Sequence, residues 1–243
     1  MKIFCIVFVC IFCSVSLLHS QLVIQPTVGV TVPTSNYSGS LSDYYSGNAY
    51  GLKPGINYGL VFSLPIGIQH TILDLGVNYS TLENSGSVYF SNDNIDLKQN
   101  LLTVYIGASY FPYPNQSDAL HPYFGINFLY TNINGSVSFT QVQNVTDGSY
   151  DMSTDDRFGI GFKFGNSFSV GDRSGVEIEF DYNIINAFGK KFNSGGNSSR
   201  IGSYQSLNDD RDPFYSPGDI DHPISKSRMI SVIQLTIGYY FHR

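Results

Sequence analysis

Residues 176–184 alternate strictly between two kinds of side chain. The apolar positions are Val176, Ile178, Phe180, Tyr182 and Ile184, and the residues between them are Glu177, Glu179, Asp181 and Asn183. Successive side chains of a β-strand point to opposite faces, so this segment is predicted to form a strand with one apolar and one acidic face. One such strand also fits a soluble sheet, and the recurrence of the pattern is what restricts the fold.

The same alternation returns in seven further segments of the chain. They are residues 22–33, 51–64, 72–82, 100–111, 122–133, 157–170 and 229–241. Their polar faces are rich in Gly and hydroxyl residues, and glycine permits the curvature and close backbone approach of a narrow barrel. The pattern predicts an all-β fold, namely a closed antiparallel up-and-down transmembrane β-barrel of about eight strands. The alternative is a soluble β-sandwich whose aromatic residues fill a core.

The connections between these segments are of two lengths. Short ones fall at 65–71, 112–121 and 171–175, and long ones at 34–50, 83–99, 134–156 and 186–228. Outer-membrane barrels have short periplasmic turns and long external loops, and an even strand count places both termini in the periplasm. Residues 136–140 alternate again and are expected to extend the fifth strand beyond the membrane. If they form a hairpin of their own instead, the strand count becomes ten.

The N-terminal segment has the features of a targeting signal. Lys2 precedes an apolar run over residues 3–18, and a cleavage site is expected near Ser20 and Gln21. We therefore expect a signal peptide over 1–20 and a single barrel domain over 21–243, located in a bacterial outer membrane. The alternative is a lipoprotein signal at Cys10 or Cys13, but neither follows a small residue.

Charge and cysteine content exclude several classes of function. The chain has 13 basic and 19 acidic side chains, a net charge of −6. Nucleic-acid binding needs a basic surface, so nucleic acid is not an expected partner. All three cysteines lie in the N-terminal segment. The rest of the chain therefore has no cysteine for a disulfide, a thiolate metal site or a nucleophile.

The polar faces of the predicted strands carry charges of both signs. These inward-facing residues are Lys53, Asp74, Arg157, Lys163, Glu177, Glu179 and Asp181. Buried charges persist when they are paired and hydrogen-bonded, so a mixed set fits a filled interior. An eight-stranded barrel is just wide enough to be filled by its own side chains. We therefore expect the charges to pack the interior rather than to line a wide channel.

Aromatic residues gather near the predicted strand ends, where they are expected to form two girdles at the membrane interfaces. One girdle includes Tyr110, Tyr123 and Tyr239, and the other includes Tyr50 and Tyr130.

The last long connection is rich in carboxylates. They include Asp209, Asp210, Asp212, Asp219 and Asp221. Clustered carboxylates can bind Ca²⁺, but their spacing does not match an EF-hand loop, and a solvated, mobile loop is the favoured interpretation. No metal or cofactor is therefore predicted. His222 is the one histidine placed outside, and no Ser or Asp joins it at a known catalytic spacing, so no enzyme is predicted.

The C-terminal segment 234–241 resembles the terminal assembly signal of the OmpA-like family of small eight-stranded outer-membrane barrels. Thr236 supplies the polar residue, Gly238 the glycine, and Tyr239 and Phe241 the alternating aromatic positions, with His242 and Arg243 following. The resemblance covers residues 21–243. It implies outer-membrane lipid and the barrel-assembly machinery as partners.

The function expected from these observations is a structural or surface-interaction role, through envelope integrity or loop-mediated adhesion to an extracellular ligand. Tyrosine and phenylalanine residues of the loops suit such contacts. They are Tyr37, Tyr44, Tyr45, Tyr50, Tyr89, Tyr204, Phe214 and Tyr215. The alternative is a narrow pore or transport component for small solutes. A rim-located enzyme, as the family also contains, is the less favoured third possibility.

Overall fold

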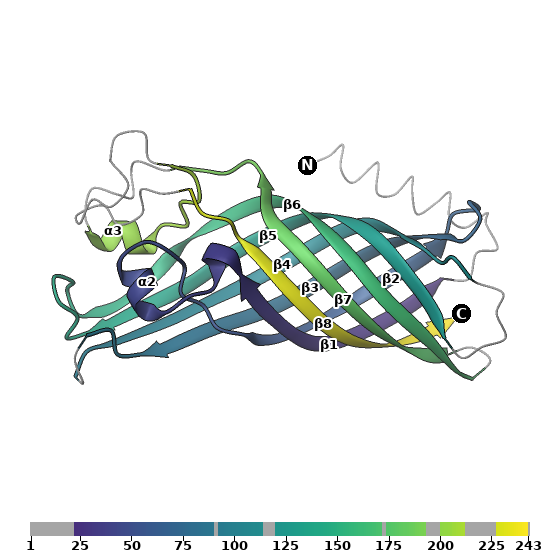
Figure 1. Ribbon diagram of the computed structural model, residues 1–243, viewed down its shortest axis with the longest axis horizontal. Coiled ribbons are helices and arrows are strands. Elements are labelled where there is room, and N and C mark those ends of the chain that lie inside the picture. The colour runs from purple at the N-terminus through teal and green to yellow at the C-terminus, as the bar shows by residue number, and fades with distance from the viewer. Residues whose placement is uncertain are drawn as a thin grey trace.

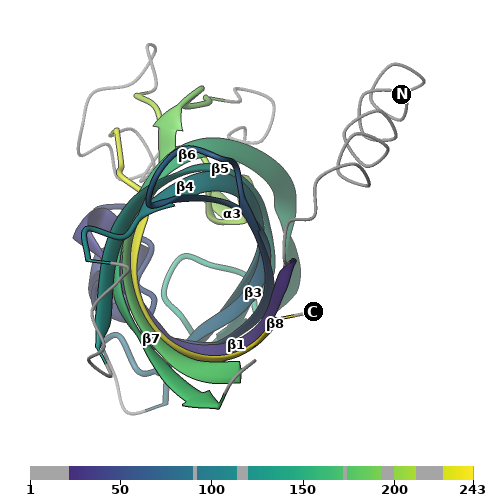
Figure 2. The same ribbon diagram turned by 90° about the vertical axis from the view of Figure 1, so that its right-hand side faces the viewer.

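The computed structural model describes residues 22–89, 92–113, 120–171, 174–192, 200–211 and 227–242. Eight antiparallel strands each pair with the next, and β1 pairs with β8, so the sheet closes into a barrel (Figure 1 and Figure 2). The strands are β1 (Val23–Thr34), β2 (Gly55–Pro65), β3 (Thr71–Gly86), β4 (Asn94–Tyr110), β5 (His121–Thr140), β6 (Gly148–Gly171), β7 (Ser174–Phe188) and β8 (Ser231–His242). The prediction of a closed eight-stranded antiparallel barrel is confirmed.

The two ends of the barrel differ in their connections. At one end, Val23 of β1 lies opposite His242 of β8, and short segments join β2 to β3, β4 to β5 and β6 to β7. We call this the turn end. The opposite end, which we call the loop end, carries the short helices η1 (Ser35–Tyr37), α2 (Leu41–Tyr45) and α3 (Arg200–Gln205) (Figure 1). The expected signal peptide over 1–20 lies outside the described residues.

The outer surface of the barrel wall is apolar. Exposed side chains on it include Val28, Ile56, Tyr58, Val104, Ile106, Phe128, Phe162, Phe164, Phe180, Leu235 and Ile237. The side chains between them point inward and are polar, as Thr31, Asn57 and Asn127 show by their burial. This arrangement is inverted relative to a soluble sheet, which buries its apolar face, so it contradicts the β-sandwich alternative.

The central strands are longer than the sequence indicated. The connection expected at 83–99 contracts to 87–93, and that expected at 134–156 contracts to 141–147, because β3, β4, β5 and β6 continue through most of both segments. Residues 136–140 extend β5, as expected, and form no additional hairpin. The second strand is an exception, since it begins at Gly55 and not at residue 51. Gly51 has a φ of +69°, which interrupts the extended backbone there.

The strand extensions reverse the polarity of the two faces. In the wall nearer the turn end, Val77 points outward and Asn78 inward. Near the loop end, Leu82 and Leu97 point inward and are buried, whereas Glu83 and Lys98 are exposed outside and form an ion pair of 2.9 Å. Lipid favours an apolar outer face and water favours a polar one, so the reversal places these hairpins beyond the membrane.

Among the described helices, none is both long and apolar enough to cross a membrane.

Candidate functional site

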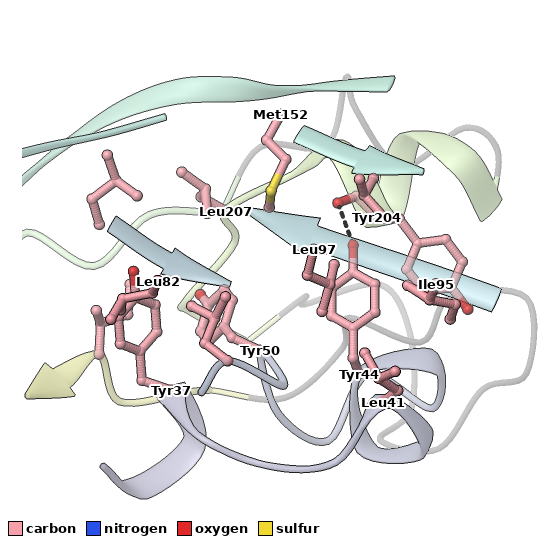
Figure 3. Close-up of a cluster of buried hydrophobic side chains, with 14 of the residues drawn as sticks. Tyr37, Leu41, Tyr44, Tyr50, Leu82, Ile95, Leu97, Met152, Tyr204 and Leu207 are labelled. Atoms are coloured by element: carbon pink, nitrogen blue, oxygen red, sulfur yellow. Dashed lines mark hydrogen bonds between the residues drawn. The ribbon is translucent and has the colours of Figure 1, made fainter. Parts of the chain in front are cut away.

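An apolar cluster closes the loop end of the barrel. Figure 3 shows side chains from η1, α2 and α3 meeting inward-facing side chains of the strand extensions. We call this cluster the apolar plug; its buried members include Tyr37, Leu41, Tyr44, Tyr50, Leu82, Ile95, Leu97, Met152, Tyr204 and Leu207. Tyrosine hydroxyls within it are hydrogen-bonded: the Tyr44 hydroxyl donates to the Tyr204 carbonyl at 3.1 Å, and the Tyr204 hydroxyl donates to the Tyr45 carbonyl at 2.6 Å.

The plug corrects the expectation that the loop tyrosines are available for adhesive contacts. Five of them are buried, namely Tyr37, Tyr44, Tyr45, Tyr50 and Tyr204. Burial raises the pKa of Tyr50 to about 12, and the nearby Arg228 guanidinium opposes this rise. The Tyr50 hydroxyl therefore stays neutral at physiological pH. Tyr89 is exposed, whereas Phe214 and Tyr215 lie outside the described residues. The assignment of Tyr50 to an interfacial girdle is also wrong.

A buried ion pair ties the last loop to the barrel wall. The side chains of Arg157 (β6) and Asp209 are both fully buried. Arg157 Nε donates to Asp209 Oδ2 at 2.9 Å, and Arg157 Nη2 donates to Asp209 Oδ1 at 3.1 Å. Asp209 also accepts from Asn186 at 2.6 Å and from the Lys191 backbone at 2.7 Å. The favoured interpretation of a solvated loop is therefore wrong for Asp209. Asp212, Asp219, Asp221 and His222 lie outside the described residues.

Helix α2 begins with a capping box. The Asp43 amide donates to the Ser40 hydroxyl at 3.1 Å, and the Ser40 amide and hydroxyl both donate to Asp43 Oδ2, at 3.0 and 2.7 Å. These bonds, the side-chain one foremost, hold the pKa of Asp43 below its ordinary value. Ser40 and Asp43 thereby fix the start of the helix that supplies Leu41 and Tyr44 to the plug.

Replacing Ser40 with Ala is expected to destabilise α2 by about 1 kcal/mol. Because the folded pKa of Asp43 is lowered, its contribution is present above the unfolded pKa and is lost as the pH falls through the folded pKa. The protection factors of the α2 amides, which are the intrinsic exchange rates at each pH divided by the observed rates, should therefore fall in acid for the unmodified protein. Asp43→Asn should remove that acid dependence, and an unchanged pH profile in this variant would contradict the assignment.

A polar layer fills the middle of the barrel. Thr31 Oγ1 lies 2.9 Å from Ser80 Oγ and accepts from Asn57 Nδ2 at 2.9 Å and from Gln234 Nε2 at 3.1 Å. Asn183 donates to Gln234 Oε1 at 3.2 Å. These side chains come from five consecutive strands of the ring, β7, β8, β1, β2 and β3, and the bonds from Thr31 and Gln234 to Ser80 pass over the strands between them.

Five of the seven predicted interior charges lie together below this layer, toward the turn end. Lys163 donates to Asp74 Oδ2 at 2.5 Å and lies 3.8 Å from Glu179 Oε2. Asp74 also accepts from Ser63 at 2.6 Å and from Ser109 at 2.5 Å. Asp181 is buried on the same face of β7 as Glu177 and Glu179.

The other two predicted charges lie elsewhere. Arg157 is inside the barrel but belongs to the loop end, where it pairs with Asp209. Lys53 is not an interior residue: its side chain is exposed, and it precedes β2, with its amide bonded to the Glu83 carbonyl at 3.3 Å. The sequence interpretation failed there because the alternation was continued through Gly51, where the strand has not yet begun.

Two interior residues were not recognised as parts of the charged group. The Tyr123 hydroxyl lies 2.7 Å from both Glu177 Oε1 and Glu179 Oε2, so the assignment of Tyr123 to an interfacial girdle is wrong. Its ring fits over Gly165 of β6, where a Cβ atom would come within 2.3 Å of the ring. Gln25 Nε2 donates to Glu177 Oε1 at 2.9 Å. The outward position of Phe124 was the available signal that Tyr123 points inward.

The C-terminal residues are placed by β8. Thr236 and Gly238 face the interior, and a Cβ at Gly238 would meet the Gln25 side chain at 2.2 Å. Tyr239 and Phe241 are exposed on the outer face with ring centroids 4.6 Å apart. Recognition of these four residues by the assembly machinery stays a prediction.

A cavity of about 660 Å³ opens at the turn end. We call it the turn-end cavity; its lining includes Val23, Gln25, Val61, Ile68, His70, Ile72, Asp74, Phe111, His121, Tyr123, Lys163, Glu177, Glu179 and Tyr240. A much smaller cavity of about 20 Å³ lies in the middle of the barrel, and Val61 and Glu179 contribute to both. Within the described part of the chain, no three His, Cys, Asp or Glu residues are arranged to hold a metal ion.

A closed antiparallel barrel with an apolar outer wall and a filled polar interior defines the class of outer-membrane β-barrel proteins. The chain belongs to the outer membrane protein beta-barrel domain family, whose model matches residues 5–208. It is thus an outer-membrane protein, with its short turns in the periplasm and the loop end outside. A comparison with curated protein sequences found no match.

Solved structures of outer-membrane proteins share the fold. Neisserial surface protein A is 13% identical, with 91% of this chain and 97% of that chain covered and a TM-score of 0.50. A major outer membrane protein from Thermus thermophilus is 11% identical, with 93% and 100% covered and a TM-score of 0.53.

Proposed function

We propose that this protein is a structural and surface-interaction protein of the outer membrane, with a barrel that anchors it and external hairpins that make its contacts. The observation that carries the proposal is the apolar plug, which fills the loop end with side chains from the first and last loops and from the strand extensions. Tyr37, Tyr50 and Tyr204 are almost completely buried within it. A pore would need an aqueous route through this cluster, and apolar side chains packed without solvent oppose one.

Two further layers oppose conduction. The Arg157–Asp209 pair holds the last loop against the wall, and the hydrogen bonds from Thr31 (β1) and Gln234 (β8) to Ser80 (β3) pass over the intervening strands into the interior. A solute would have to separate both layers after passing the plug. Each separation leaves buried polar groups unpaired, which costs about 1–3 kcal/mol for each neutral group and more for a charge.

The external hairpins offer the contact surface. Beyond the reversal of polarity, β3–β4 and β5–β6 present hydrophilic outer faces that include Asp96, Lys98 and Asp151. Their inner faces pack into the plug, so the hairpins are held by the barrel and do not depend on a partner for their structure. Tyr89, with 55% of its surface exposed, lies at the tip of β3–β4 and is a candidate contact residue.

Purified protein in planar bilayers is expected to show no conductance above that of the bare membrane. Insertion is checked on the same preparation by flotation with liposomes and by the faster migration of unboiled protein on a gel. Stable conductance steps that change in a Glu179→Ala variant would favour the narrow-pore alternative and overturn the proposal.

The surface role has its own test. Replacement of the exposed residues Gln143 and Thr146 by Ala should leave the gel shift of the unboiled barrel unchanged, since both lie in the connection of β5 to β6 outside the membrane and buried Val142 keeps its place in the plug. Adhesion of producing cells to matrix-coated surfaces should fall in this variant and in Tyr89→Ala. If neither change alters adhesion above the background of cells without the protein, the adhesive form of the proposal is wrong.

A further inference from the structure

The turn-end cavity has the size and the lining of a small-molecule site. Its volume of about 660 Å³ lies within the range of about 300–1,000 Å³ that is usual for ligand pockets. Val61, Ile72 and Phe111 contribute apolar wall, and Asp74, Lys163, Glu177, Glu179 and Tyr123 bring polar groups together within it. The cavity opens toward the periplasm, so it is separate from the external hairpins.

Charge within the cavity and just above it is unbalanced. The carboxyl groups of Asp74, Glu177, Glu179 and Asp181 lie on the inner wall, with Lys163 as their one Lys or Arg partner among the described residues. Lys163 makes its short contact with Asp74, and its distance to Glu179 is 3.8 Å. His70 and His121 line the same cavity, and neither forms an ion pair with these carboxyl groups in the described structure.

The Oε2 atom of Glu177 is available to accept a hydrogen bond. Glu177 Oε1 accepts from Gln25 Nε2 at 2.9 Å and lies 2.7 Å from the Tyr123 hydroxyl, whose single proton is shared with Glu179 Oε2; both of these partners are neutral. No residue in the described ranges donates to Oε2 or forms an ion pair with this carboxyl group. A half-buried carboxyl group that has fixed neutral donors on one oxygen and a cavity beside it is preorganised to accept a charge-assisted hydrogen bond.

We propose that the turn-end cavity binds a small amphipathic amine from the periplasm, with the ammonium group at Glu177 Oε2 and Glu179 beside it, and the apolar body against Val61 and Phe111. An anion would face an excess of carboxyl groups. A divalent metal would lack a third protein ligand at suitable spacing in the described part of the chain. This binding role is additional to the proposed surface function and does not depend on it.

The probe for the test is 4-fluorobenzylamine, and 4-fluorobenzyl alcohol is its neutral match with the same ring. Binding to the full-length protein in zwitterionic lipid nanodiscs is followed by ¹⁹F NMR line broadening, with empty nanodiscs measured in parallel. The amine is expected to bind saturably and at least tenfold more tightly than the alcohol. Equal binding of both compounds, or broadening no greater than in empty nanodiscs, would overturn the proposal.

Three variants separate the effect of the Glu177 charge on binding, the effect of the cavity volume, and effects of a Glu→Gln substitution that do not depend on the site. Glu177→Gln should weaken amine binding at least tenfold and leave alcohol binding unchanged. Glu83→Gln is the matched control, because it makes the same substitution on an exposed residue of the external hairpin and should leave amine binding unchanged. Val61→Phe keeps every charge but fills the cavity, so it should weaken the binding of both the amine and the alcohol.

Folding of each variant is checked by the gel shift of the unboiled barrel. If Glu177→Gln fails this check, Val61→Phe still tests whether the cavity is the binding site. Full amine affinity in a folded Glu177→Gln or Val61→Phe protein would contradict the proposal, as would an equal loss in Glu83→Gln.

Discussion

Arg157→Ala is expected to lower the free energy of unfolding by about 3–5 kcal/mol, because it leaves Asp209 buried without its cationic partner. The Asp209 side chain has no exposed surface, and its remaining donors, Asn186 and the Lys191 amide, carry no formal charge. Arg157 also donates to the Leu207 carbonyl at 2.8 Å, so the substitution removes a second attachment of the same loop.

Urea unfolding of the refolded protein in lipid measures this effect. Lys191→Ala is the matched control: Lys191 pairs with Asp155 at 2.7 Å, but half of its side chain is exposed. Exposed pairs contribute about 0–1 kcal/mol, so this control should change stability little. Limited proteolysis should show earlier cleavage in the last loop for Arg157→Ala alone. Equal stability of the two variants would show that the buried pair does not hold the loop.

Lys163→Met is expected to lower the free energy of unfolding by a similar amount, about 3–5 kcal/mol, by removing the charge and keeping much of the side-chain volume. Asp74 is buried, and after the substitution only the hydroxyls of Ser63 and Ser109 would donate to it. Glu179 would also lose the ammonium group at 3.8 Å.

The double variant Lys163→Met/Asp74→Asn tests this explanation. An amide at position 74 can accept from one serine through its oxygen and donate to the other serine hydroxyl through its nitrogen, and it carries no charge, so the double variant should be more stable than Lys163→Met. Lys98→Met is the control on the external hairpin, where Lys98 pairs with exposed Glu83 at 2.9 Å. The loss there should be much smaller, because solvent screens an exposed pair. A double variant that is less stable than Lys163→Met would show that packing, and not an unpaired carboxylate, explains the effect.

The alternation of residues 176–184 was sufficient to predict β7 and the direction of its side chains. Phe180 and Ile178 are exposed on the outer wall, and Asp181 is buried inside. The same rule identified the central part of the other strands, because a lipid-facing barrel repeats one local constraint in each of them. It failed in the strand extensions, where Leu82 and Leu97 point inward and Glu83 and Lys98 outward. Water replaces lipid there, so the apolar face must turn inward.

The candidate site was predictable in part. Asp74, Lys163, Glu177, Glu179 and Asp181 share the inward face of their strands, and strand parity alone places them inside. The partners that shape the group could not be read in the same way. The Tyr123 hydroxyl reaches Glu177 across 54 residues of sequence, and Asp209 reaches Arg157 across 52. Such contacts depend on which strands are neighbours and where a loop folds back.

A closed barrel of eight strands follows from the local pattern of the chain, because each strand must satisfy its backbone within the sheet and present an apolar face to lipid. What fills that barrel depends on contacts that form only when the whole chain has folded. The loop tyrosines, which alternation cannot place, become an apolar plug because α2, α3 and the strand extensions converge at one end. The turn end receives no such loop from the described part of the chain, and the interior remains open there as a cavity beside Glu177.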